Sequence, residues 1–180
     1  MRVIAGSARG VPLRAPRDRA TRPITDRVKE TLFAILGELV PDARVLDLYA
    51  GSGAVGIEAL SRGAASADLV ERHRAAVDVI HANLAATHLA DRARAHEGDV
   101  EAYLRDTADG PWDLVVLDPP YEVRAIVAPL RAVVPHLAPG AVVAVKHFWR
   151  TEVPDVDGVV VFRQRRFGET MLTFLEQEDA

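Results

Sequence analysis

Short apolar runs alternate with longer amphipathic segments along most of this chain. Five such runs are separated by helix-length segments and lie at residues 45–49, 69–71, 93–97, 114–118 and 141–146. Repeated strand–helix–strand order predicts a parallel, doubly wound sheet with helices on its faces. Two further runs, 159–164 and 170–175, are joined too closely for a helical crossover, so they should be antiparallel. The pattern predicts an α/β, Rossmann-like fold with a mostly parallel seven-stranded sheet whose last strands are antiparallel.

The N-terminal residues depart from this repeat. Two short apolar runs, 3–4 and 11–13, flank a glycine-containing segment and predict a β-hairpin that projects from the domain. We therefore divide the chain into an N-terminal hairpin or arm, residues 1–24, and one domain, residues 25–180.

A helix is expected to follow the hairpin. It should begin near Thr25 and end at Pro41-Asp42, with apolar residues at helical spacing at Val28, Leu32, Ile35, Leu36 and Leu39. This helix would cover a ligand site at the sheet edge. Thr25 and Arg27 would then either reach the ligand or serve only as a helix cap and a surface charge.

Composition is typical of one soluble domain. The 180 residues are 49% hydrophobic, which is enough for a single core. The absence of cysteine excludes disulfides, thiolate metal ligands and a cysteine nucleophile. The histidines lack metal-ligand spacing, so no metal is expected. With neither an apolar signal segment nor a run of the roughly 20 residues needed to span a bilayer, we expect a cytoplasmic protein without membrane contact.

Charge is unevenly distributed. Residues 1–30 carry eight basic and three acidic side chains, a net charge of +5, whereas the whole chain carries −4. Arginine pairs bidentately with phosphate, so we expect this segment to position RNA. The candidate contacts are Arg2, Arg9, Arg14, Arg22 and Arg27. The alternative is a compositional bias, since arginine outnumbers lysine 20 to 2.

A second basic cluster lies near the C-terminus, at Arg163, Arg165 and Arg166. It would either flank RNA or protect an edge strand from aggregation.

The run that ends at Tyr49 turns through glycines into a helical pattern. Gly51, Gly53 and Gly56 satisfy the G-x-G-x-x-G spacing, in which missing Cβ atoms permit close approach of a ligand to the backbone. Asp47 lies four residues before the first glycine, where it would oppose a pyrophosphate but suit the ammonium group of a methionine moiety. This favours S-adenosylmethionine over NAD as the cofactor.

Further acids follow the other predicted strands. Glu71 ends the second strand, where a ribose-binding acid is expected. Asp99 would accept from an adenine amino group, or would only cap the next helix. Parallel strands bring their carboxyl ends to one sheet edge, so these acids should share one site with Asp47 and Asp118. We assign the cofactor site to Asp47, Tyr49, Gly51, Ser52, Gly53, Glu71, Arg72, Asp99 and Val100.

The tetrad Asp118-Pro119-Pro120-Tyr121 closes the apolar run 112–117. Prolines lack N–H groups, so the carbonyls around them face a pocket without internal donors. Acceptors of this kind suit an incoming amine, with Asp118 and the Pro119 carbonyl each taking one hydrogen and Tyr121 stacking on the attached ring. The alternative is that the tetrad merely ends a strand. We assign the catalytic residues to Asp118, Pro119, Pro120 and Tyr121.

The glycine loop, Glu71, Asp99 and the tetrad, in that order, resemble the class I S-adenosylmethionine-dependent amino-methyltransferases. Segments 2–10, 21–33, 48–53 and 167–170 narrow the resemblance to the RsmD family of bacterial small-subunit ribosomal RNA methyltransferases. Membership would imply S-adenosylmethionine as cofactor and methyl transfer to the N2 amine of one guanine, guanine-966, of 16S ribosomal RNA, as RNA or in an assembling small subunit, by a monomeric enzyme.

Two positions depart from the family pattern. Phe167 stands where tyrosine is commoner, and Lys146-His147 stands where an acidic or neutral pair is expected. We expect neither departure to touch the chemistry.

Other functions remain compatible with the same acceptor geometry. The chain would then methylate a DNA adenine or a protein glutamine, or would be a noncatalytic, cofactor-binding ribosome-assembly factor. An NAD-dependent oxidoreductase is the weakest alternative, because Asp47 disfavours it.

Overall fold

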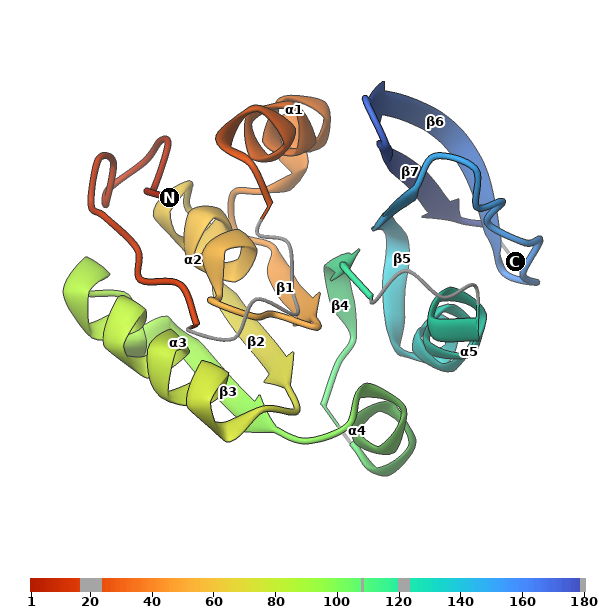
Figure 1. The fold of residues 1–180 in the computed structure, drawn as a ribbon. Helices are drawn as coiled ribbons and strands as arrows, with labels where there is room; N and C mark the ends of the chain where they lie inside the picture. The colour runs from red at the N-terminus through yellow and green to blue at the C-terminus, as the bar shows by residue number, and fades with distance from the viewer. Residues whose placement is uncertain (17–23, 108, 120–123, 179–180) are drawn as a thin grey trace.

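The computed structural model describes residues 1–16, 24–107, 109–119 and 124–178 (Figure 1). The sequence-predicted residues Pro120, Tyr121 and Arg22 therefore lie outside the described residues.

A twisted sheet with strand order β3-β2-β1-β4-β5-β7-β6 forms the centre of the molecule (Figure 1). Each neighbouring pair in the run β3-β2-β1-β4-β5 is parallel, and β7 is antiparallel to both β5 and β6. The bounds are β1 Arg44–Leu48, β2 Ser66–Glu71, β3 Ala93–Glu97, β4 Trp112–Leu117, β5 Leu137–Phe148, β6 Val159–Phe167 and β7 Thr170–Gln177. The predicted α/β fold with antiparallel last strands is confirmed.

Helices cover both faces of the sheet. On one face lie α1 Asp26–Leu36, α2 Ala54–Ser61 and α3 Arg74–Thr87, and on the other lie α4 Val100–Asp106 and α5 Arg124–Val133 (Figure 1). Short 3-10 turns are η1 Gly37–Leu39, η2 Ala90–Arg92 and η3 Val134–His136. Each layer buries its own apolar cluster against the sheet, so the two cores are separated by the strands. No helix in the described part of the chain is both long and apolar enough to cross a bilayer.

Helix α1 is shorter than predicted. Thr25 caps its start, with Oγ1 accepting from the Val28 N–H at 3.4 Å. The helix ends at Leu36, because Gly37 adopts φ 47° and turns the chain into η1. Leu39, predicted as a buried helical position, is instead 49% exposed.

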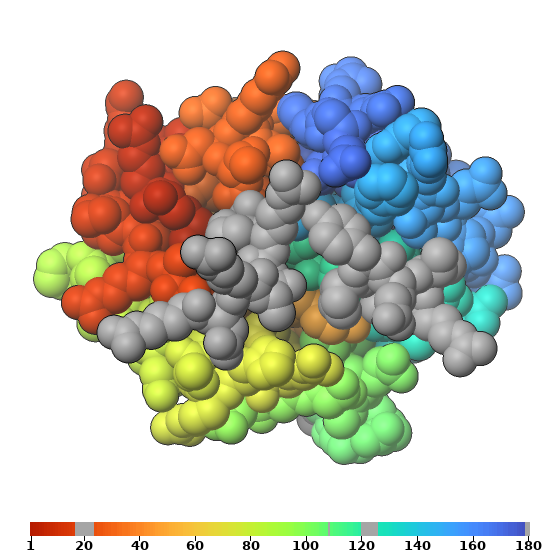
Figure 2. All heavy atoms as spheres, in the orientation of Figure 1, coloured from red at the N-terminus to blue at the C-terminus, as the bar shows by residue number. Residues whose placement is uncertain are grey.

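The N-terminal residues pair as predicted but do not project. Val3 and Val11 are joined by an N–H···O bond of 3.0 Å, and Arg2 and Pro12 form one isolated antiparallel bridge in place of two strands. Val3 is fully buried. Figure 2 shows the red N-terminal atoms continuous with the body of the molecule. The segment packs along α2, because it carries apolar side chains that the domain buries.

A buried carboxylate on α2 holds this segment in place. Glu58 is fully buried and accepts from the Ile4 N–H at 2.8 Å and the Ala5 N–H at 3.0 Å. Lys29 of α1, also fully buried, lies 3.2 Å from the same carboxylate, and Arg62 donates to it at 2.8 Å. The charge is thus paired and hydrogen-bonded, the condition under which a buried carboxylate is tolerated.

Close approach at Gly6 provides a test of this packing. A Cβ on Gly6 would lie 1.7 Å from the Ser61 carbonyl oxygen, whereas a Cβ on Gly10 would meet nothing within 4 Å. Both glycines have positive φ, 82° and 85°, so Gly6→Ala and Gly10→Ala share the same backbone strain. We expect Gly6→Ala to lower the free energy of unfolding by a further ~1–3 kcal/mol, the usual cost of overpacking, measured by urea denaturation. Equal losses in the two variants would contradict the packing described for the N-terminal segment.

Candidate functional site at the carboxyl edge of the sheet

The carboxyl ends of β1, β2, β4 and β5 border a cavity of about 220 Å³. Ten of the sequence-predicted residues line it: Asp47, Tyr49, Gly51, Ser52, Glu71, Arg72, Asp99, Val100, Asp118 and Pro119. The four acids that follow or end the strands, Asp47, Glu71, Asp99 and Asp118, thus line one cavity, as expected. Of the assigned cofactor residues, Gly53 lies outside the lining and forms the N-cap of α2.

The glycine loop has the backbone that its spacing predicts. Gly51 and Gly53 have φ 55° and 75°, and Tyr49 also has a positive φ of 63°. Gly56 is closely packed, because a Cβ there would lie 2.9 Å from Leu69 Cδ2 and the Leu69 side chain would have to shift. Burial raises the pKa of Tyr49 to about 12, so its hydroxyl stays protonated at the cavity wall.

Asp47 is buried beneath the loop, with only 2% of its surface exposed. Its Oδ2 accepts from the Gly56 N–H at 2.9 Å. Burial raises its pKa to about 7, the Gly56 hydrogen bond opposes the rise, and the nearby charges of Asp118 and Glu71 add to it. Asp47 is therefore a group that a cation in the cavity would convert to the carboxylate.

Glu71 ties the second strand to the glycine loop. One carboxylate oxygen accepts from the Gly51 N–H at 3.0 Å and the other from the His73 N–H at 2.9 Å. A carboxylate has about four acceptor sites, so both oxygens retain capacity for ligand hydroxyls. Glu71 thus orders the loop and can still face a ligand.

Asp99 caps the start of α4, which is the helix-capping role considered as the alternative to adenine binding. Its Oδ1 accepts from the Ala102 N–H at 3.1 Å. Asp99 also lines the cavity, so the cap does not remove it from the site. Contact with an adenine amino group stays a prediction.

Lys146 is the residue that sequence reasoning misjudged. Its Nζ donates to Asp118 Oδ1 at 2.5 Å, and its side chain, 10% exposed, lines the same cavity. Burial raises the pKa of Asp118, and the Lys146 ammonium opposes that rise. The expectation that Lys146 lies away from the chemistry is therefore wrong. No sequence signal linked the two residues, because 28 positions separate them.

His147, which with Lys146 departs from the family pattern, has a packing role. Its two ring nitrogens lie 2.9 Å from the Phe148 carbonyl and 2.8 Å from Thr173 Oγ1. Burial lowers the pKa of His147, so its ring is neutral at physiological pH. It holds β5 against β7 outside the cavity lining.

Asn83 of α3 is a residue that the sequence analysis did not single out. It is 1% exposed, and its amide joins two segments of the cavity wall. Nδ2 donates to the Ser52 carbonyl at 2.9 Å and the Arg14 carbonyl at 3.0 Å, and Oδ1 accepts from the Arg14 N–H at 2.8 Å. The available signal was a polar residue on the apolar face of α3, beside Ile80 and Leu84.

The described N-terminal arginines lie at the surface and outside the cavity lining. Arg2, Arg9, Arg14 and Arg27 are all exposed, and none lines the cavity. The Arg27 guanidinium lies 6.0 Å from the centre of the Phe167 ring. Met1, Ala15, Pro16 and Ile24 line the cavity instead, so the N-terminal residues contribute backbone and apolar surface to the site.

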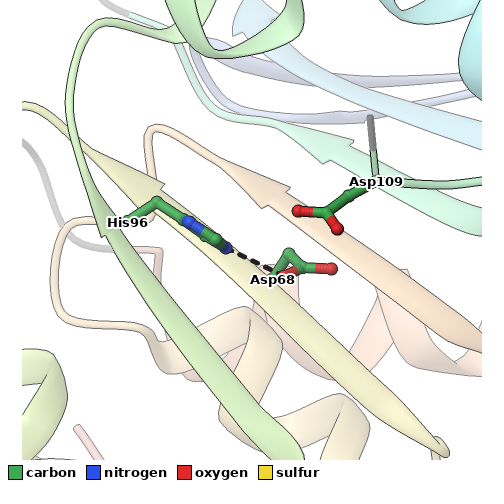
Figure 3. A group of neighbouring side chains, drawn as sticks. All are labelled: Asp68, His96 and Asp109. Carbon is green, nitrogen blue, oxygen red and sulfur yellow. Dashed lines mark hydrogen bonds and ion pairs between the residues drawn. The ribbon is translucent and has the colours of Figure 1, made fainter. Parts of the chain in front are cut away.

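Asp68, His96 and Asp109 form a separate polar cluster away from this cavity (Figure 3). Their possible ligand atoms lie within 4.8 Å of one another. Asp68, however, already accepts from His96 at 2.9 Å and from the buried Trp112 indole at 3.0 Å. Although burial alone would raise it, these hydrogen bonds hold the pKa of Asp68 below its ordinary value. Asp68 is therefore accounted for as the partner of the Trp112 indole N–H and of His96.

The family model described as conserved hypothetical protein 95 matches residues 1–176. The putative rRNA methyltransferase YlbH of Bacillus subtilis is 35% identical over 175 residues, covering 94% of this chain and 95% of that protein. Ribosomal RNA small subunit methyltransferase D of Escherichia coli K12 is 44% identical over 121 residues, covering 67% of this chain and 60% of that protein.

A solved structure shows the same fold along the whole chain. The putative methyltransferase yhhF from Escherichia coli superposes with a TM-score of 0.89 at 34% identity, covering 99% of this chain and 98% of that one. Because the family model and this superposition both extend over nearly all of the chain, the protein belongs to the conserved hypothetical protein 95 family, the RsmD family indicated by its motifs.

Proposed function

We propose that this protein transfers a methyl group from S-adenosylmethionine to the N2 amine of a guanine in 16S ribosomal RNA, at guanine-966. The observation that carries the proposal is the Asp118 carboxylate, which faces the same cavity as the glycine loop and is held there by Lys146. The relatives named as ribosomal RNA methyltransferases support ribosomal RNA as the substrate class. The choice of the guanine N2 amine rests on the family resemblance.

Four carboxyl groups that line the cavity support the assignment of S-adenosylmethionine to it. Strand order β3-β2-β1-β4 places Asp99, Glu71, Asp47 and Asp118 in sequence along one edge. Neighbouring strands lie about 4.8 Å apart, so these acids span roughly 14 Å across the sheet. In this assignment Asp99 faces the adenine, Glu71 the ribose hydroxyls and Asp47 the methionine ammonium.

When bound, S-adenosylmethionine supplies an electrophilic methyl group on a sulfonium. The protein's contribution is to orient the attacking nitrogen. Asp118 and the Pro119 carbonyl each accept one amine hydrogen, which turns the nitrogen lone pair toward the methyl group. The amine proton leaves to Asp118 or to water after transfer, so no strong base is needed. The predicted stacking of Tyr121 on the base completes the proposal.

Asp118 acts in this scheme as an acceptor, so it must be ionised. Its burial favours the neutral acid, and Lys146 favours the carboxylate. Lys146 is therefore a positioning residue in the proposal: it fixes one Asp118 oxygen and keeps the other available for the substrate amine.

The proposed activity is tested by methyl transfer from radiolabelled S-adenosylmethionine to small ribosomal subunits and to bare 16S RNA from a strain lacking this protein. Nucleoside analysis should show N2-methylguanosine at a single site, and the better substrate identifies the form that the enzyme recognises. Methylation of DNA adenine or protein glutamine, or cofactor binding with no transfer to any acceptor, would overturn the proposed function.

Substitution of Asp118 separates catalysis from cofactor binding. Asp118→Ala removes an amine acceptor but none of the residues assigned to the cofactor. We expect methyl transfer to fall at least ~100-fold while the cofactor dissociation constant changes less than about threefold, because orientation of the amine is lost. Calorimetry and single-turnover transfer measure the two quantities. A folded variant that loses both equally would refute this division of roles.

Substitution of Lys146 tests its effect on Asp118 ionisation. Lys146→Met removes the charge that lowers the Asp118 pKa, so the acid limb of the kcat profile should move to higher pH. Activity should then recover as pH is raised, because Asp118 ionises again. Lys146→Arg, which keeps the charge, is the matched control and should retain a profile close to that of the unsubstituted enzyme. An unchanged profile in Lys146→Met would reduce Lys146 to a packing residue.

A further inference from the structure

A stack of two arginines on a tryptophan lies just beyond the candidate active site. The Arg166 guanidinium lies 3.7 Å from the centre of the Trp149 ring, and that of Arg150 lies 4.7 Å from it. Arg166 Nε donates to the Gly168 carbonyl at 2.8 Å, and the backbone N–H of Trp149 donates to the Glu169 carbonyl at 2.9 Å. These bonds anchor the stack to the turn between β6 and β7.

The two guanidinium groups retain donors for a ligand. Within the described ranges, neither Arg150 nor Arg166 forms an ion pair with an acidic side chain, and both are exposed. Only Nε of Arg166 is used in the bond to Gly168. A guanidinium held against an aromatic ring, with outer N–H groups that bond to no residue in the described part of the chain, is pre-organised for a bidentate anion such as phosphate.

The stack belongs to the same edge of the sheet as the cavity. Lys146 lines the cavity from β5, and Trp149 follows it by three residues, about 10 Å of extended chain. On the other side of the turn, Phe167 lies beneath Arg27 of α1. Figure 2 shows α1 (orange), the β6–β7 turn (dark blue) and the segment after β5 (light blue) adjoining one another. Arginines from three separate segments therefore meet on one rim.

Protection of an edge strand does not account for this arrangement. Arg163, Arg165 and Arg166 all lie on β6, the edge strand of the sheet, where charge prevents edge-to-edge association, but of these three only Arg166 stacks on Trp149. Trp149 and Arg150 lie after β5, an interior strand, and the half-buried Trp149 ring carries two guanidinium groups, which edge protection does not require. The ring restricts the orientation of the guanidinium groups that lie on it.

We propose that Trp149, Arg150 and Arg166 form a phosphate-binding surface that holds the backbone of the substrate RNA beside the base being methylated. The proposal rests on the proposed function for its choice of RNA as the ligand. Arginine forks bind the phosphates, and the stacked indole limits their rotation, so less conformational entropy is lost on binding. RNA would thus be held from the C-terminal side of the site as well as by the N-terminal arginines.

The test compares two charge-matched double variants. Arg150→Gln with Arg166→Gln removes the two stacked cations, and Arg74→Gln with Arg105→Gln removes two exposed cations on α3 and α4. Binding to bare 16S RNA is measured over a range of salt concentrations. We expect the first variant to bind at least ~10-fold more weakly, with a salt slope lower by about one to two, because phosphate contacts are lost. Cofactor affinity and unfolding temperature should match the control.

A third variant tests the role of the ring. Trp149→Leu keeps both charges but removes the stack, so RNA binding should weaken with little change in salt slope. If Arg150→Gln with Arg166→Gln binds RNA as the control does while the unsubstituted enzyme methylates it, this surface is refuted and the proposed function stands. If the unsubstituted enzyme transfers no methyl group yet its RNA binding depends on the stack, the proposed function fails and the surface stands.

Discussion

The buried Glu58 carboxylate is the interaction on which the arrangement of the site depends. It is fully buried on α2, the helix that begins at the glycine loop, and it is stabilised by Lys29 of α1 and by two backbone N–H groups of the N-terminal segment. A buried carboxylate without such partners would cost several kcal/mol. The N-terminal segment, α1 and α2 are therefore mutually required, and the loop that borders the cavity rests on all three.

Asn83 extends this dependence to the cavity wall. Because its amide bonds both Arg14 and Ser52, the N-terminal residues and the glycine loop share one hydrogen-bonding partner. The opposite side of the cavity has a comparable link, since Lys146 of β5 fixes the carboxylate that ends β4. The site is thus held by polar contacts between residues distant in sequence, over a scaffold that apolar packing provides.

This division explains what the sequence could predict. Apolar periodicity predicted the strands, because burial imposes it directly, but not their order in the sheet. It missed the first part of β5, since Pro139-Gly140 in Leu137–Phe148 has the composition of a turn, and it extended α1 past Gly37 because Leu39 continued the spacing. Strand-end acids were found because parallel strands place them at one edge. The Lys146–Asp118 pair was not, because its geometry arises only when β4 and β5 align.

The position of Glu58 in the chain has a consequence for synthesis. Its backbone partner Ile4 precedes it by 54 residues, so the segment around Ile4 leaves the ribosome before α2 and has no docking surface until α2 has emerged. Until then, Val3 and its apolar neighbours are exposed on a nascent chain, alongside a cluster of arginines. When α2 is complete, docking of Ile4 on Glu58 closes a long loop at a modest entropic cost and buries Val3 and its apolar neighbours. The segment around Ile4 is made before the glycine loop but can reach its native position only after that loop has been made.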